Sequence, residues 1–288
     1  MSSGEGYYDL SPNKRTLRSL RSDVTPITAV EELVDNVLDN WRRVDSPQND
    51  ITIDVDFDFE NEVFRIEDDS GGLGEENVKK IFALGGSTKE EIPNSIGSYG
   101  MGAKKAILRL GHRAVIKSRT VDDDTAYGFV IDEEWLQSDN WQVTKRQFDD
   151  VDAGSTVIRI EGLDIELQEN HELETMMDED EESSNFDTSE EYLRSLREDL
   201  SKTYDEFLKG RAGPDDETVS ITVNGKRVTQ QPEINWAYTP FDGYHPRFYK
   251  RYEISSEEIP GRNEPIKVDI IAGLMRTGES AKAGTIRL

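Results

Sequence analysis

The chain has 288 residues, enough for one large domain or two smaller ones with a buried core. It contains no cysteine, which excludes disulfides and thiolate metal sites, and no apolar run approaches the roughly 20 residues that span a bilayer. We therefore expect a cytoplasmic location and no membrane contact.

The formal net charge is −26 at pH 7, and the acidic residues are spread over the whole chain. Such a charge repels nucleic acid unless basic residues cluster locally or salt screens it. Arginine (20) also outnumbers lysine (14). This pattern is typical of proteins from a high-salt cytoplasm, so we expect a halophilic source. In that case the charge indicates little about partners.

Residues 1–24 are polar and carry a basic patch, which predicts an N-terminal arm. Thr25 followed by proline predicts the start of a helix, and Thr28 with Glu31 fits a capping box. Apolar residues at helical spacing continue to Trp41. The first regular element is therefore expected to be an amphipathic helix.

The middle of the chain alternates short apolar segments with turn residues. Strands are expected at 51–59, 63–66, 114–119, 126–131 and 156–160, and helices at about 75–84 and 103–110. Residues 85–102 between the two helices are rich in glycine and serine, which predicts a mobile lid.

The last third begins with an acidic low-complexity insertion at about 164–190, which we expect to be a loop. A charged helix is predicted at 189–208, and glycine and proline at 213–214 indicate a domain boundary. Asn224-Gly225 predicts a hairpin with a type I′ turn over 220–228. A further strand is expected at 268–273. We expect one domain over 25–212 and a partial second one over 213–288.

Three segments carry side chains suited to chemistry, and the first is on the predicted N-terminal helix. Glu32 and Asn36 are one helical turn apart and share a face with Asp39. A neutral oxygen ligand beside a carboxylate suits Mg²⁺, and the free carboxylate can deprotonate a water. Taken alone, this pattern is also typical of the solvent face of an amphipathic helix.

The second segment, Asp68 to Leu73, directly follows a predicted strand. Paired glycines, including Gly72, permit a flat ligand to approach the backbone. A buried Asp68 can accept a hydrogen bond from an exocyclic amine. Alone, this segment is as well explained by an Asx turn.

The third segment runs from Gly97 to Lys104 into a predicted helix. Consecutive backbone N–H groups at a helix start form an anion site, and Lys104 adds a positive charge. The spacing matches neither a P-loop nor a Rossmann fingerprint. Glycine-rich lids also occur without ligands.

Together the three segments closely resemble the signature of the GHKL superfamily, which contains gyrase B, the ninety-kilodalton chaperone, histidine kinases and MutL. Gly154-Ser155-Thr156 resembles the late Gly-Thr segment of that family. The resemblance implies an α+β fold, a two-layer α/β sandwich called the Bergerat fold, with a mixed, mostly antiparallel sheet. It also implies that 213–288 is a partial transducer-like domain.

The resemblance assigns roles by position. Glu32 would be the general base, Asn36 the Mg²⁺ ligand and Asp68 the reader of the adenine amino group. Gly72 would make room for the base. The other ATP-site positions that the resemblance implies are Asp39, Leu73, Ser87, Gly97, Tyr99, Gly100, Met101, Gly102, Ala103, Lys104, Ser155 and Thr156. Ser70 and Ser155 stand where the family more often has Gly and Thr.

The kind of GHKL protein follows from Glu32, because histidine kinases usually carry Asn there. None of the three histidines, His112, His171 and His245, lies in an upstream helix. Residues 100–104 most resemble the lid of MORC-like ATPases. The resemblance implies a slow ATPase that dimerises on ATP as a clamp. The alternatives are a non-hydrolysing, nucleotide-dependent interaction module and, more weakly, a histidine or anti-sigma-type kinase. A protein partner is possible, and DNA binding stays open.

Overall fold

The computed structural model describes residues 14, 24–43, 50–82, 101–165, 188–212 and 217–232, and the backbone of strands 247–254 and 266–273. The helices are α2 (Pro26–Arg43), α3 (Glu75–Val78), η2 (Lys79–Ile81), α4 (Gly102–Leu110), α5 (Glu133–Gln137), α6 (Ser189–Thr203) and α7 (Asp205–Leu208). The strands are β1 (Ile51–Asp58), β2 (Val63–Asp68), β3 (Gly111–Ser118), β4 (Ala126–Ile131), β5 (Arg146–Phe148), β6 (Thr156–Leu163), β7 (Val219–Val223), β8 (Lys226–Arg227), β9 (Arg247–Ile254) and β10 (Ile266–Gly273).

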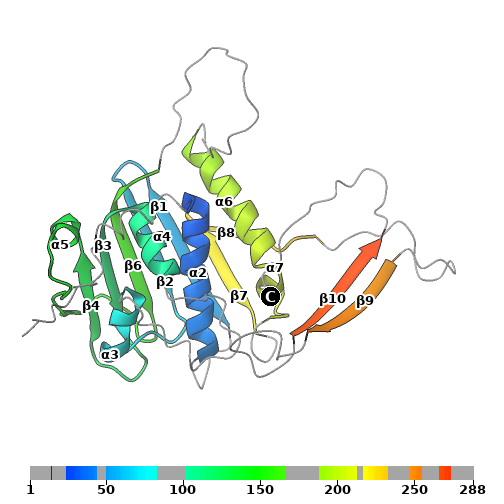
Figure 1. The fold of residues 1–288 in the computed structure, drawn as a ribbon, viewed down its shortest axis with the longest axis horizontal. Helices are drawn as coiled ribbons and strands as arrows, with labels where there is room; N and C mark the ends of the chain where they lie inside the picture. The colour runs from blue at the N-terminus through cyan, green and yellow to red at the C-terminus, as the bar shows by residue number, and fades with distance from the viewer. Residues whose placement is uncertain are drawn as a thin grey trace, which may run out of the picture.

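Eight strands form one sheet in the order β5-β4-β3-β6-β2-β1-β7-β8. Neighbouring strands are antiparallel except β1 and β7, which run parallel. Helices α2, α4 and α6 lie over one face of this sheet (Figure 1). The fold is therefore an α+β two-layer sandwich with a mixed, mostly antiparallel sheet, which confirms the expected class.

Strand β1 shows why the helices cover one face only. Ile51, Ile53, Val55 and Phe57 are buried, whereas the residues between them are half-buried. Side chains alternate across a strand, so the apolar set faces the helices. The apolar face of α2 meets it through residues at helical spacing, including Val30, Leu33, Val34, Val37 and Trp41.

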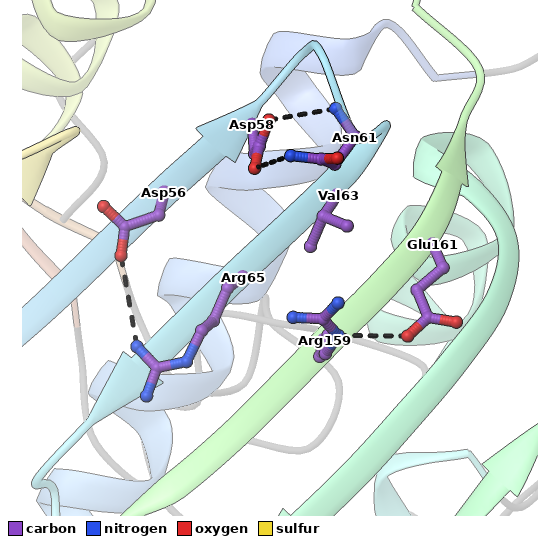
Figure 2. A pocket seen from close by; sticks show the side chains of 7 residues that line it. All are labelled: Asp56, Asp58, Asn61, Val63, Arg65, Arg159 and Glu161. Atoms are coloured by element: carbon purple, nitrogen blue, oxygen red, sulfur yellow. Dashed lines mark hydrogen bonds and ion pairs between the residues drawn. The ribbon is translucent and has the colours of Figure 1, made fainter.

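The opposite face of the sheet is charged. Asp56 and Arg65 lie 4.0 Å apart, and Arg159 bonds Glu161 at 3.0 Å. These side chains line an open hollow of about 530 Å³, in which Asp58 also accepts from Asn61 (Figure 2). Each cation shown there has a carboxylate neighbour, so the hollow is a mixed-charge surface rather than an anion site.

The start of α2 differs in detail from the expected capping box. The Thr25 hydroxyl accepts from the Thr28 N–H at 3.1 Å, so Thr25 is the cap. Glu31 is one turn too far along the helix to complete a box with Thr25. Its carboxylate instead accepts from the Thr203 hydroxyl at 2.7 Å.

The predicted hairpin over 220–228 is present, and it joins the large sheet. Asn224 and Gly225 both have positive φ, as a type I′ turn requires. The Asn224 side chain accepts from the Phe57 N–H and donates to the Phe57 carbonyl, each at 2.8 Å. Because β7 also pairs with β1, β7 and β8 belong to the large sheet, and the domain boundary expected at 213 stays a prediction.

Further elements also depart from prediction. The helix expected at 189–208 is broken at Tyr204 into α6 and α7. The helix expected at 75–84 is a single turn followed by a 3₁₀ turn that ends at Ile81. Helix α5 and strand β5 were not predicted. Residues 83–100, most of the acidic insertion and most of the N-terminal arm lie outside the described residues.

Strands β9 and β10 form a separate antiparallel pair. A transducer-like second domain stays a prediction. Within the parts of the chain that the structure describes, no helix is both long enough and apolar enough to cross a membrane.

Tyr204 breaks the helix because its side chain is buried against α2. Its hydroxyl lies 2.7 Å from Asp35 Oδ1 and 2.9 Å from the Glu31 carbonyl. Asp35 is itself buried, so the phenol supplies a hydrogen bond to a carboxylate that has little access to water.

We predict that Tyr204→Phe lowers the free energy of unfolding by about 1–3 kcal/mol, because a buried acceptor loses its donor. Urea unfolding followed by circular dichroism measures the change. Tyr127→Phe, on the half-buried face of β4, controls for loss of a phenol and should cost less. Equal stability of Tyr204→Phe and the wild type would contradict this account of the helix break.

Candidate functional site

The candidate site begins at the end of β2, where Asp68 is buried. Asp68 Oδ1 accepts from the Ser70 N–H at 3.0 Å and from the Ser70 hydroxyl. Burial raises the pKa of Asp68 to about 7, although the two hydrogen bonds from Ser70 oppose the shift. The site thus contains a carboxyl whose charge is sensitive to whatever contacts it near neutral pH.

The turn after Asp68 requires glycine at Gly72. Its φ is +66°, and a Cβ at this position would overlap the Arg119 carbonyl. The neighbouring Gly71 N–H donates to the Gly154 carbonyl at 2.9 Å. The 68–73 turn is therefore pressed against the backbone that follows β3 and precedes β6.

Two buried hydroxyl groups, those of Ser118 and Thr156, lie beside this turn, and Ser118 bonds to its backbone. Ser118 Oγ lies 2.7 Å from Thr156 Oγ1 and receives the Leu73 N–H at 2.7 Å. It also donates to the Ser155 carbonyl at 3.1 Å. Thr156 pairs with Asp68 in the β2–β6 register. The predicted residues Asp68, Leu73, Ser155 and Thr156 are thus brought together.

Helix α2 is tied to the same turn by Asn40. The Asn40 amide donates to Ser70 Oγ at 3.0 Å and lies 3.3 Å from the Ser70 and Gly72 carbonyls. Arg43 donates to the Asn40 amide oxygen. Because Asn40 is buried, these bonds fix how α2 approaches the Asp68 turn.

The other end of the site brings Glu32 to the start of α4. A Cβ on Gly102 would overlap Glu32 Oε2, so the carboxylate lies directly against the first residue of α4. Met101 precedes that helix and supplies no side-chain cap. The helix start, with its positive dipole end, therefore lies beside a carboxylate.

Asn36 and Asp39 occupy the same exposed side of α2 as Glu32. Asn36 is exposed, and its amide nitrogen donates to the Glu32 carbonyl, a bond that does not use the amide oxygen. An amide oxygen held in this way fits a hard cation such as Mg²⁺. Asp39 is half-buried, and its charge acts on Arg42 one turn later.

The remaining predicted positions have different outcomes. Lys104 is buried, with 1% of its surface exposed, and Ala103 beside it is buried too. Ser87, Gly97, Tyr99 and Gly100 lie outside the described residues. The structure therefore describes the two ends of the expected site but not the glycine-rich segment before Met101.

A match to a family model decides what this arrangement is. Residues 24–160 match the model described as "Histidine kinase-, DNA gyrase B-, and HSP90-like ATPase". Over these residues the chain is similar to the GHKL ATPases. The matched segment contains α2, the Asp68 turn, the start of α4 and the β6 segment, all of which build the site.

Part of the chain is also similar to curated proteins of one kind. The chain is 35% identical over 98 residues to Protein MICRORCHIDIA 7 of Arabidopsis thaliana, covering 33% of this chain and 13% of that protein. Protein MICRORCHIDIA 4 of the same plant is 33% identical over 98 residues, again 33% of this chain and 12% of that protein. The chain is MORC-like over the 98 matched residues, which span about an eighth of these relatives.

A solved structure was also matched. The crystal structure of the ATPase region of Saccharomyces cerevisiae topoisomerase II bound to dexrazoxane aligns with 70% of this chain and 48% of that chain. The TM-score is 0.44 and the sequence identity 16%. At that similarity the match carries no argument about the site.

The sequence missed Asn40 and Ser118 as site residues. Both were detectable as polar residues at positions where the pattern requires apolar ones. Asn40 precedes Trp41 on the buried face of α2, and Ser118 continues the inward series of Ala114 and Ile116. A polar residue at a core position needs a partner, and here the partners are site backbone atoms.

We predict that Asp68→Asn stabilises the nucleotide-free protein at pH 8 but not at pH 4. The raised pKa means that the folded state holds a proton that the unfolded state has lost between about pH 4 and 7. The stability of the wild type therefore falls as pH rises through that window. Asn does not ionise, so its advantage should reach the order of 4 kcal/mol at pH 8.

Urea unfolding of both proteins at pH 4, 6 and 8 measures this difference. Asp122→Asn is the control, because Asp122 is exposed. A stability difference between Asp68→Asn and the wild type that does not change with pH would contradict the assignment of a raised pKa to Asp68.

Proposed function

We propose that this domain binds ATP with Mg²⁺ and hydrolyses it slowly. Similarity to the GHKL ATPases over residues 24–160 supports ATP binding. The observation that carries the proposal of hydrolysis is the Glu32 carboxylate placed against the start of α4. A base and an anion-binding helix start then lie side by side, as attack of water on a terminal phosphate requires.

The adenine end of the proposed site is Asp68. Ser70 occupies Oδ1, so Oδ2 is the oxygen through which the carboxyl would accept from an exocyclic amine. A donor from the ligand favours the ionised form and would lower the pKa of Asp68 on binding. Gly72 would leave room for the base above the turn.

The phosphate end is the start of α4. The Met101 and Gly102 amides would face the phosphates, with the helix dipole favouring negative charge. Glu32 would orient and deprotonate the water. Mg²⁺, held by the Asn36 oxygen, would neutralise phosphate charge and complete its shell with water and phosphate oxygens. Lys104, Ser87, Gly97, Tyr99 and Gly100 stay proposed contributors from sequence resemblance.

The cellular role we propose is that of a nucleotide-gated clamp. ATP would order the glycine-rich segment before Met101 and favour pairing of two copies of the chain, and hydrolysis would reverse it. The support is the glycine-rich composition of that segment and the likeness to MORC-like proteins. A protein or DNA client would be enclosed rather than bound by the acidic surface of one chain.

Replacing Glu32 tests the hydrolytic part of the proposal. We predict that Glu32→Ala lowers the rate of phosphate release by at least about 100-fold, because the general base is lost. ATP affinity, measured by equilibrium dialysis, should change only a few-fold. Glu198→Ala, which removes an exposed carboxylate on α6, is the control.

Unchanged phosphate release by Glu32→Ala would refute the base assignment. ATP binding without phosphate release in the wild type would favour the non-hydrolysing interaction module instead. Phosphate transferred to protein would favour the kinase alternative.

Gly102→Ala tests the close approach itself. The new Cβ would displace the flexible end of Glu32 without straining the helix backbone. We predict an unchanged or slightly higher free energy of unfolding and phosphate release reduced on the order of tenfold. Gly74→Ala, whose Cβ would meet its nearest neighbours at 3.6 Å, should leave turnover unchanged. Full turnover in Gly102→Ala would contradict this geometry.

A further inference from the structure

We propose that α5 and the loop after it form a cage for a lysine ammonium, and that Lys14 of the same chain fills it. The cage consists of Trp135, Ser138, Asn140 and Trp141. Lys14 lies more than 120 residues earlier in the chain, and only 4% of its surface is exposed. This site does not depend on nucleotide binding or turnover.

The polar part of the cage matches an ammonium group. Lys14 Nζ lies 2.6 Å from the Trp135 carbonyl, 2.5 Å from the Asn140 carbonyl and 3.1 Å from Ser138 Oγ. An ammonium has three N–H donors and no acceptor, so three oxygens satisfy it fully. A guanidinium, which is flat and larger, does not match this arrangement.

The apolar part of the cage is made of two tryptophans. Lys14 Nζ lies 3.5 Å from the centre of the Trp135 ring and 5.5 Å from that of Trp141. The two rings are perpendicular, with centroids 5.9 Å apart. A cation over an indole face is attracted by the ring quadrupole, most strongly when it is shielded from water.

The cage is held in shape by bonds that do not involve Lys14. The Trp135 indole N–H donates to the Gln142 carbonyl at 3.0 Å, and the Gln142 N–H donates to Asn140 Oδ1 at 2.9 Å. Ser138 N–H closes the end of α5 on the Glu134 and Trp135 carbonyls. The loop is therefore preorganised, which reduces the entropy cost of binding.

Charge and access also favour this occupant. The carbonyl end of α5 carries partial negative charge, and Asp139 attracts the lysine.

Trp135, Ser138 and Asn140 line an open hollow of about 330 Å³, with Val130 from β4 and Arg146 from β5 among the other residues that line it. Trp135 also packs on Phe82, with ring centroids 5.8 Å apart. The Trp135 ring thus contacts both Lys14 and the end of the 75–82 segment.

Amine acylation of the full chain tests the cage. Brief treatment with an N-hydroxysuccinimide ester of acetic acid, followed by peptide mass spectrometry, gives a labelling rate for each lysine. We expect Lys14 to react on the order of tenfold more slowly than Lys79 and Lys226, which are exposed. Burial lowers the pKa of Lys14, which by itself would speed acylation, so slow labelling reports shielding.

Two variants test whether the slow labelling of Lys14 is due to the cage. Trp141→Leu changes a side chain that is 37% exposed, so the fold should persist, and its thermal melting curve checks this. Labelling of Lys14 should rise toward that of Lys79, with Lys79 and Lys226 unchanged. Lys14→Met, which keeps the stem and removes the charge, should raise amide hydrogen exchange over residues 138–142. Lys226→Met is its control.

Two results would overturn the proposal. Labelling of Lys14 in the wild type as fast as that of Lys79 would show that the ammonium is not enclosed. Protection that disappears on dilution would show that the lysine comes from a second copy, and the intrachain assignment would then be wrong.

Discussion

The hydrogen bonds from Asn40 to the 70–72 turn hold the candidate site together. They join α2, which carries Glu32 and Asn36, to the turn that carries Asp68. Core packing already sets α2 on the sheet, and Asn40 adds a direct polar link between this helix and the Asp68 turn. Because Asn40 is buried, its amide has few alternatives to these partners, and the geometry is specified rather than merely permitted.

The architecture was largely readable from the sequence because its signals are local. The period-2 pattern of β1, the Asn-Gly turn and the helical spacing of α2 each report on one element. Pairing of β7 with β1 was missed because it joins segments about 170 residues apart. The break at Tyr204 was missed for the same reason, since the buried contact with Asp35 overrides a continuous helical pattern.

The residues of the candidate site also divide into those that local spacing predicts and those that depend on contacts between elements. Spacing identified Glu32, Asp68, Gly72 and Gly102, and the structure supplied a reason for the two glycines in the backbone or carboxylate that each one touches. Asn40 and Ser118 act through contacts between elements, which no spacing rule contains. Burial of Asp68 favours the neutral form of its carboxyl. A hydrogen-bond donor from a ligand at the same position would favour the charged form.

The central claim is that Asp68 and α2 form one adenine-nucleotide site. Its most direct test compares the dissociation constants of ATP and purine riboside triphosphate, which lacks the exocyclic amine, by equilibrium dialysis with Mg²⁺. The account predicts saturable binding of ATP at least about tenfold tighter than that of the analogue, as the loss of a hydrogen bond to a buried carboxylate implies. Equal affinities, or no saturable ATP binding, would contradict it.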